Sequence, residues 1–124
     1  MIHETMWSPD TCSCILIYTW DDALDENVRT HTIERVLRRC PAHASLTKDT
    51  EIYGTVVEEN TRKNKAFGLA QGIVPNLTTE DYEWSFDANR KLRATFRGKL
   101  SVTQAVKLRQ TCDSQLGANR VEVS

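Results

Sequence analysis

The chain has 124 residues, a formal charge of −1 and 27% charged residues. This length allows one compact domain or two small lobes that share a core. The near-neutral charge gives no general attraction to nucleic acid or to acidic surfaces. No apolar run approaches the length of a membrane span, and the N-terminal segment does not resemble a signal peptide. We therefore expect a soluble, unsecreted protein in a reducing compartment.

Two short clusters of metal-ligand residues occur in the first third of the chain. Cys12 and Cys14 form a Cys-x-Cys pair, and Cys40 and His43 form a Cys-Pro-Ala-His pair. Thiolate and imidazole are ligands of tetrahedral zinc sites, and a Cys₃His set completes one. Each pair supplies two ligands locally, so only one loop has to close. The four residues therefore predict a structural zinc site.

The segment between the two pairs has the pattern of a β-hairpin. Residues 14–20 and 30–37 are rich in β-branched and aromatic side chains, and a polar segment separates them. If the two runs pair around Asn27, Cys14 comes opposite Cys40 at the open end. Pro9 and Asp10 are turn residues that allow the first strand to begin at Cys14. We predict a zinc-clasped hairpin over residues 1–46.

Other uses of the ligand residues remain open. Disulfides and free thiols are alternatives, although disulfides are disfavoured because no signal peptide is apparent. A [2Fe–2S] cluster can take mixed ligands, but Cys14 replaces a histidine of the Rieske pattern. Copper(I) accepts thiolates, but no methionine ligand accompanies them. Neither His3 nor His31 is flanked by a nucleophile pattern, and no zinc-deaminase signature or glycine-rich phosphate loop occurs. We expect neither catalytic residues nor an organic cofactor site.

A long helix is predicted over residues 47–72, with Thr47 or Asp49 as its N-cap. Positions spaced by three and four residues define its inner face, namely Ile52, Tyr53, Val56, Val57, Asn60, Asn64 and Phe67. Early acidic and late basic charges suit the helix dipole. The connector that follows, through about Thr79, contains Pro75 and is the best candidate for a boundary.

Residues 80–124 have the pattern of a ββαβ unit. Tyr82, Trp84 and Phe86 alternate with polar residues, a turn follows at 88–90, and a second alternating run ends at Phe96. Ser101 begins a capping box for a helix that stops at Gly117, and residues 120–124 suggest a closing strand. We expect a three-stranded sheet whose aromatic face packs on the helix rather than stacking bases, with Cys112 as a buried thiol. The predicted fold class is α+β.

The run from Ser8 to Asp21, the Cys40-Pro-Ala-His43 pair and the helix around Glu58–Asn64 resemble small uncharacterised proteins from tailed phages and environmental viral sequences. The resemblance implies a phage setting, in the host cytoplasm or the virion, without an assigned activity. Our leading hypothesis is a non-enzymatic, zinc-stabilised protein that binds a protein partner or itself, as a virion or assembly accessory.

Two further hypotheses remain. A nucleic-acid-binding zinc module would use the basic residues Arg35, Arg38, Arg39, Arg90, Arg93 and Arg97. An iron–sulfur or other metalloprotein would have a redox role. An acidic group at the hairpin tip, Asp21, Asp22, Asp25 and Glu26, is another surface on which function can lie.

Overall fold

The computed structural model of the chain describes residues 1–23, 25 and 32–124, and its fold is α+β. Its internal contacts divide the chain into two compact units, Met1–Asn60 and Thr61–Ser124. The division falls inside helix α1 (Asp49–Ile73), whereas the sequence favoured the connector after that helix as the boundary. Among the described residues, no helix is both long enough and apolar enough to cross a bilayer.

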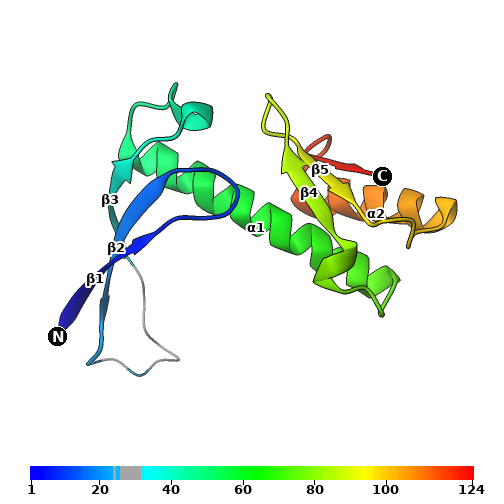
Figure 1. Cartoon of the computed structure of the whole chain (residues 1–124), viewed down its shortest axis with the longest axis horizontal. Helices are drawn as coiled ribbons and strands as arrows, with labels where there is room; N and C mark the ends of the chain where they lie inside the picture. The colour runs from blue at the N-terminus through cyan, green and yellow to red at the C-terminus, as the bar shows by residue number, and fades with distance from the viewer. Residues whose placement is uncertain (24, 26–31) are drawn as a thin grey trace. The chain divides into compact units, whose positions relative to one another are not determined.

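The first unit contains a three-stranded antiparallel sheet in the order β1-β2-β3 (Figure 1). Strands β2 (Ile15–Asp21) and β3 (Thr32–Arg38) are the two predicted strands, and their antiparallel pairing is confirmed. The predicted hairpin centre at Asn27 lies outside the described residues. Strand β1 (Ile2–Trp7) was not predicted, and it pairs with the other side of β2.

The core of the first unit joins this sheet to the beginning of α1. Its buried apolar residues are Cys14, Leu16, Cys40, Ile52 and Val56. The predicted helix at 47–72 is thus confirmed, with its start at Asp49. Its predicted inner face is partly wrong, because Asn64 is exposed and Glu59 is buried.

The second unit has the predicted ββαβ order. Strands β4 (Glu83–Phe86) and β5 (Leu92–Thr95) pair antiparallel, and β6 (Val121–Val123) returns parallel to β5 after helix α2 (Val102–Leu116). A short 3₁₀ helix, η2 (Thr79–Asp81), precedes β4. A parallel neighbour requires such a crossover, which α2 supplies here.

The predicted aromatic face of the second sheet packs into the core of this unit. Tyr82 stacks between Phe67 and Phe96, with ring centroids 5.3 and 5.1 Å apart. The Nζ of Lys63 lies 4.9 Å from the centre of the Trp84 ring. Phe67 and Lys63 belong to α1, so that helix covers this face as well as α2 does. The aromatic residues therefore pack in the core, as predicted.

The capping box at the start of α2 gives the first testable prediction. Ser101 Oγ accepts the backbone N–H of Gln104 at 3.1 Å, and Gln104 Oε1 accepts the backbone N–H of Ser101 at 2.9 Å. We expect Ser101→Ala to lower the free energy of unfolding of the second unit by about 1 kcal/mol, because an N-cap bond is lost. Urea denaturation followed by NMR measures this. Ser114→Ala, at an exposed site inside the same helix, should cause no loss; equal losses would contradict the prediction.

Candidate metal centre

The first ligand pair lies in the turn between β1 and β2. Strand β1 ends at Trp7, and β2 begins one residue after Cys14. The Ser8 hydroxyl donates a hydrogen bond to the carbonyl oxygen of Cys14 at 3.2 Å, which closes this turn. Because Cys12 and Cys14 precede the strand, the wide spacing of alternate strand residues does not separate them. The predicted bend before Cys14 is confirmed.

The second pair lies at the end of β3, where one 3₁₀ turn, η1 (Pro41–His43), follows Cys40. Proline is well suited to a first helical position because the N–H that it lacks would have no partner there. The His43 N–H donates to the Cys40 carbonyl at 3.1 Å. Residues three apart eclipse each other on a 3₁₀ turn, so the Cys40 and His43 side chains point the same way.

The two pairs converge on one small volume. The three sulfur atoms and a ring nitrogen of His43 all lie within 4.8 Å of one another. His43 Nδ1 lies 3.0 Å from Cys40 Sγ and 3.5 Å from Cys14 Sγ. A tetrahedral site with ordinary zinc bond lengths separates its ligand atoms by about 3.6–3.8 Å. Cys12, Cys14, Cys40 and His43 are thus close enough to clasp a metal ion.

Burial and hydrogen bonding set the protonation of the thiols. Cys14, Cys40 and His43 are buried, and Cys12 is partly exposed. Burial raises the pKa of Cys12 to about 12 and also raises that of Cys14. Burial also opposes ionisation of Cys40, but hydrogen bonds with Cys14 and His43 outweigh it and lower its pKa to about 6. Metal binding therefore has to displace protons from Cys12 and Cys14, so metal affinity should fall as the pH falls.

Among the described residues, the other candidate ligand residues do not join this cluster. His3 Nε2 lies 2.6 Å from Asp22 Oδ2, and its ring stacks on Trp20. His31 lies outside the described residues, as does Glu26 of the acidic tip. Cys112 is buried in the core of the second unit, so the prediction of a buried thiol is confirmed.

Three thiols and an imidazole form a soft donor set. Such a set suits zinc or an iron–sulfur centre better than magnesium or calcium, which prefer oxygen ligands. No family model, curated protein or solved structure matches the chain. The chemistry of these four side chains therefore supports a metal-binding cluster, without choosing the metal.

The sequence prediction missed one residue of the site. Glu59 Oε1 lies 2.7 Å from His43 Nε2, on the side of the ring opposite the thiols, and both side chains are buried. Glu59 follows Ile52 by seven residues and Val56 by three, which is the spacing of the buried face of α1. That spacing was the signal available in the sequence. Glu59 did not stand out, because the helix contains several other acidic residues.

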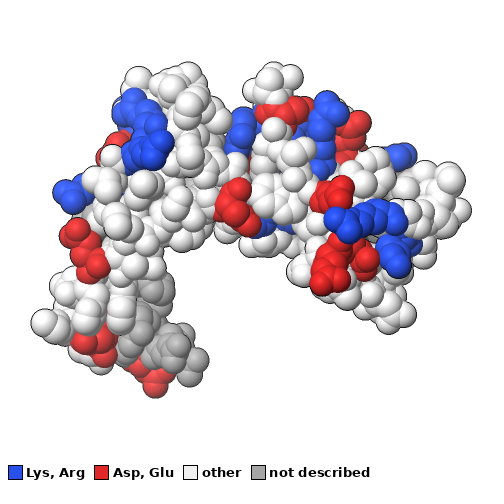
Figure 2. Space-filling view, viewed as in Figure 1, with Lys and Arg blue, Asp and Glu red and all other residues white. Residues whose placement is uncertain are grey.

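Three of the arginines proposed for nucleic-acid contact form ion pairs within their own units. Arg97 lies 2.7 Å from Glu83, and Arg93 lies 3.7 Å from both Asp87 and Glu122. In the first unit Arg35 pairs with Glu4 at 3.8 Å. Figure 2 shows blue and red side chains interleaved over the visible face of the second unit. These pairs offset part of the local positive charge.

The buried thiol of Cys112 gives a pH prediction for the second unit. Burial, with a smaller contribution from Asp113, raises its pKa from 9.0 to about 11. The folded state thus binds the proton more tightly than the unfolded state. Its contribution to stability is complete below pH 9 and is lost as the pH rises through about 11. The loss amounts to about 3 kcal/mol.

Denaturation of the second unit between pH 8 and 11, followed by NMR, measures this loss. Cys112→Ala should lower stability at pH 8 because it removes buried volume, but it should flatten the decline above pH 9. An equally steep decline in wild type and variant would assign the effect to another group, such as Tyr82, whose pKa burial also raises.

Proposed function

We propose that the chain is a non-enzymatic, zinc-stabilised protein that works by binding, with a phage virion or assembly accessory as its most specific form. The observation that carries this proposal is the convergence of Cys12, Cys14, Cys40 and His43 within 4.8 Å. Zinc suits this donor set because it accepts thiolate and imidazole ligands in tetrahedral geometry. Its lack of redox chemistry also fits a non-enzymatic protein.

The completeness of the ligand set supports a structural role for the metal. A catalytic zinc commonly has three protein ligands and keeps a position for water. Here four side chains surround one point, and three of them are buried. A [2Fe–2S] cluster spreads its ligands over two irons, whereas this compact set suits a single ion. We therefore rank zinc above an iron–sulfur centre with a redox role.

A protein partner or self-association is supported by exposed apolar side chains in the first unit. Ile2 and Met6 on the outer strand β1 are 71% and 64% exposed. Strand β1 is also at the edge of its sheet, and an exposed edge strand can pair with another chain. The phage setting rests on the resemblance of the segment around Cys12 and Cys14 to viral proteins.

Elemental analysis of the purified protein is the first test. We expect one zinc per chain and no visible absorption. A brown protein that contains iron and sulfide would show that the site holds an iron–sulfur centre instead of zinc. Light scattering after size-exclusion chromatography then tests self-association, and mass spectrometry of purified phage particles tests the virion form. A monomer that is never found in particles would contradict that form.

Nucleic-acid binding is the second candidate function. Arg38 and Arg39 are exposed directly before Cys40, which favours it, although Arg39 also donates to the Thr47 carbonyl at 3.4 Å. The ion pairs of Arg35, Arg93 and Arg97 weaken it. If it is correct, affinity for DNA or RNA falls steeply between 50 and about 200 mM salt. The absence of a shift at low salt would exclude it.

A further inference from the structure

A carboxylate from helix α1 reaches the candidate metal centre from behind His43. Glu59 Oε1 lies 2.7 Å from His43 Nε2, and the two side chains are 1% and 2% exposed. Glu59 is therefore as deeply buried as the ligand that it contacts. The contact joins α1 to a centre whose four candidate ligands all lie outside that helix.

The contact with Glu59 bears on which nitrogen of His43 carries its proton. A carboxylate is a hydrogen-bond acceptor, so this contact favours the tautomer in which Nε2 is the donor. The neutral ring then has its lone pair on Nδ1, and Nδ1 is the atom that faces Cys14 and Cys40. Glu59 thus presents the histidine in the tautomer that a metal needs. A carboxylate in this position also makes the ligand nitrogen more basic.

Packing alone does not account for an acidic residue at this position. Glu59 continues the buried spacing of Ile52 and Val56, where an apolar side chain would pack without desolvating a charge. A buried ion pair or charged hydrogen bond is often no more stabilising than apolar residues of the same volume. A role at the metal centre explains the carboxylate better than stability does.

We propose that Glu59 is a positioning residue of the metal centre, and that it couples metal occupancy to the placement of the first half of α1. The inference rests on the proposed zinc site. Bound metal would hold the turn at Cys12 and Cys14, the 3₁₀ turn at Cys40 and His43, and, through His43 and Glu59, the helix. Zinc would then order part of α1 as well as the sheet.

Three variants of the full-length protein separate the contributions of Glu59. Glu59→Gln keeps the volume and an oxygen acceptor but removes the charge, whereas Glu59→Ala removes both. Glu58→Gln, at the exposed neighbouring position, is the matched control. Zinc affinity is measured by competition with a chromophoric chelator. We expect Glu59→Ala to bind zinc about 10–100-fold more weakly, Glu59→Gln to lose less, and the control to equal wild type.

Two further measurements distinguish positioning from general damage. Long-range ¹H–¹⁵N spectra of the zinc-bound wild type and Glu59→Gln should show His43 protonated at Nε2. Hydrogen exchange should show that zinc protects the amides of residues 55–60 in wild type, with much less protection in Glu59→Ala.

The outcomes separate this inference from the proposal on which it rests. If wild type binds no zinc, the zinc site itself is wrong. If wild type binds zinc and both Glu59 variants bind it equally tightly with the same protection of α1, Glu59 has no role at the metal centre and the inference is overturned. If Glu59→Ala does not fold, Glu59→Gln alone decides between these results.

Discussion

Removal of the metal with a chelator is expected to unfold the first unit, Met1–Asn60, and to leave the second unit folded. Among the residues described in the first unit, five buried apolar side chains form the core, and two of them, Cys14 and Cys40, are candidate ligands. Structural zinc contributes about 10–16 kcal/mol of apparent binding free energy in small zinc-dependent domains. That exceeds the stability expected of about 60 residues without a metal.

Two-dimensional NMR of the zinc-loaded protein before and after chelation measures this directly. The chemical shifts of the first unit should collapse into the narrow range of an unfolded chain. The signals of residues 74–124 should keep their positions. Cys40→Ser should behave as the chelated wild type does, because it removes a buried candidate ligand. Cys112→Ser, in the other unit, should retain the zinc-dependent signals. Full retention of the first unit after complete removal of zinc would contradict a structural role for the metal.

Local sequence patterns predicted the parts of the fold in which neighbouring residues decide the structure. The capping box at Ser101, the turn before Arg90 and the stop at Gly117 each depend on a few adjacent residues. Arg90 and Gly117 have positive φ values of 58° and 102°, and Asn89 N–H and Lys91 N–H both donate to Asp87 Oδ1. The ligand pairs were predictable for the same reason, since each lies within one turn.

Three features that depend on distant contacts were not predicted. The two faces of strand β1 do not separate apolar from polar residues. The exposed face carries the apolar Ile2 and Met6, and the other face carries His3 and Thr5. Periodicity therefore gives no strand signal there. Glu59 lies on the buried face of α1, but its partner His43 comes from another element. The boundary inside α1 is equally invisible in the sequence, since the helix is continuous across it.

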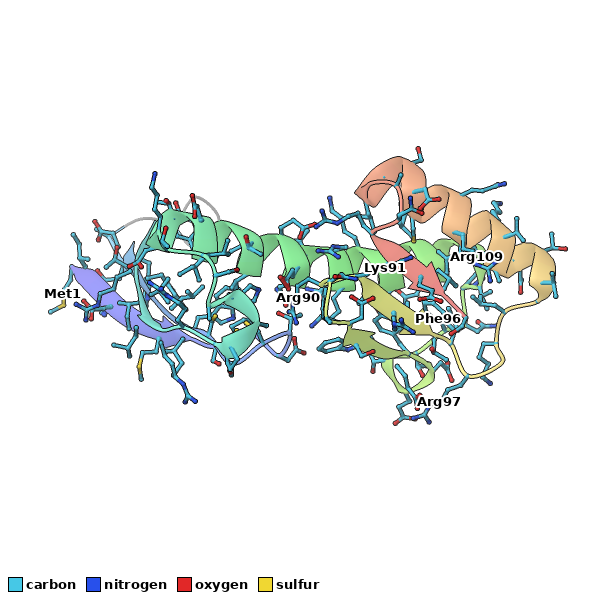
Figure 3. The ribbon with its side chains drawn as sticks, turned by 90° about the horizontal axis from the view of Figure 1, so that it is seen from above. Met1, Arg90, Lys91, Phe96, Arg97 and Arg109 are labelled. Atoms are coloured by element: carbon cyan, nitrogen blue, oxygen red, sulfur yellow. The ribbon has the colours of Figure 1, made fainter. Side chains whose placement is uncertain are left out.

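Phe96→Ala is expected to destabilise the second unit by about 3–5 kcal/mol, the usual loss for a fully buried phenylalanine. Phe96 is 1% exposed and stacks on Tyr82, whose hydroxyl donates to the Lys63 carbonyl of α1 at 3.0 Å. Removing the ring opens a cavity and leaves one face of the Tyr82 ring without its stacking partner. In Figure 3 Phe96 lies within the second unit, whereas the adjacent Arg97 lies at its periphery.

A loss of this size approaches the whole stability of a unit of about 60 residues, so much of the second unit should unfold near room temperature. Urea denaturation followed by NMR measures the change, and Val102→Ala, at an 83% exposed site of the same unit, should change stability by less than about 0.5 kcal/mol. Cobalt(II) bound in place of zinc reports the first unit through its thiolate absorption. That band should persist in Phe96→Ala, because the ligands belong to the other unit. Equal stability of Phe96→Ala and Val102→Ala would refute the assigned core, and loss of the cobalt band would show that the two units fold together.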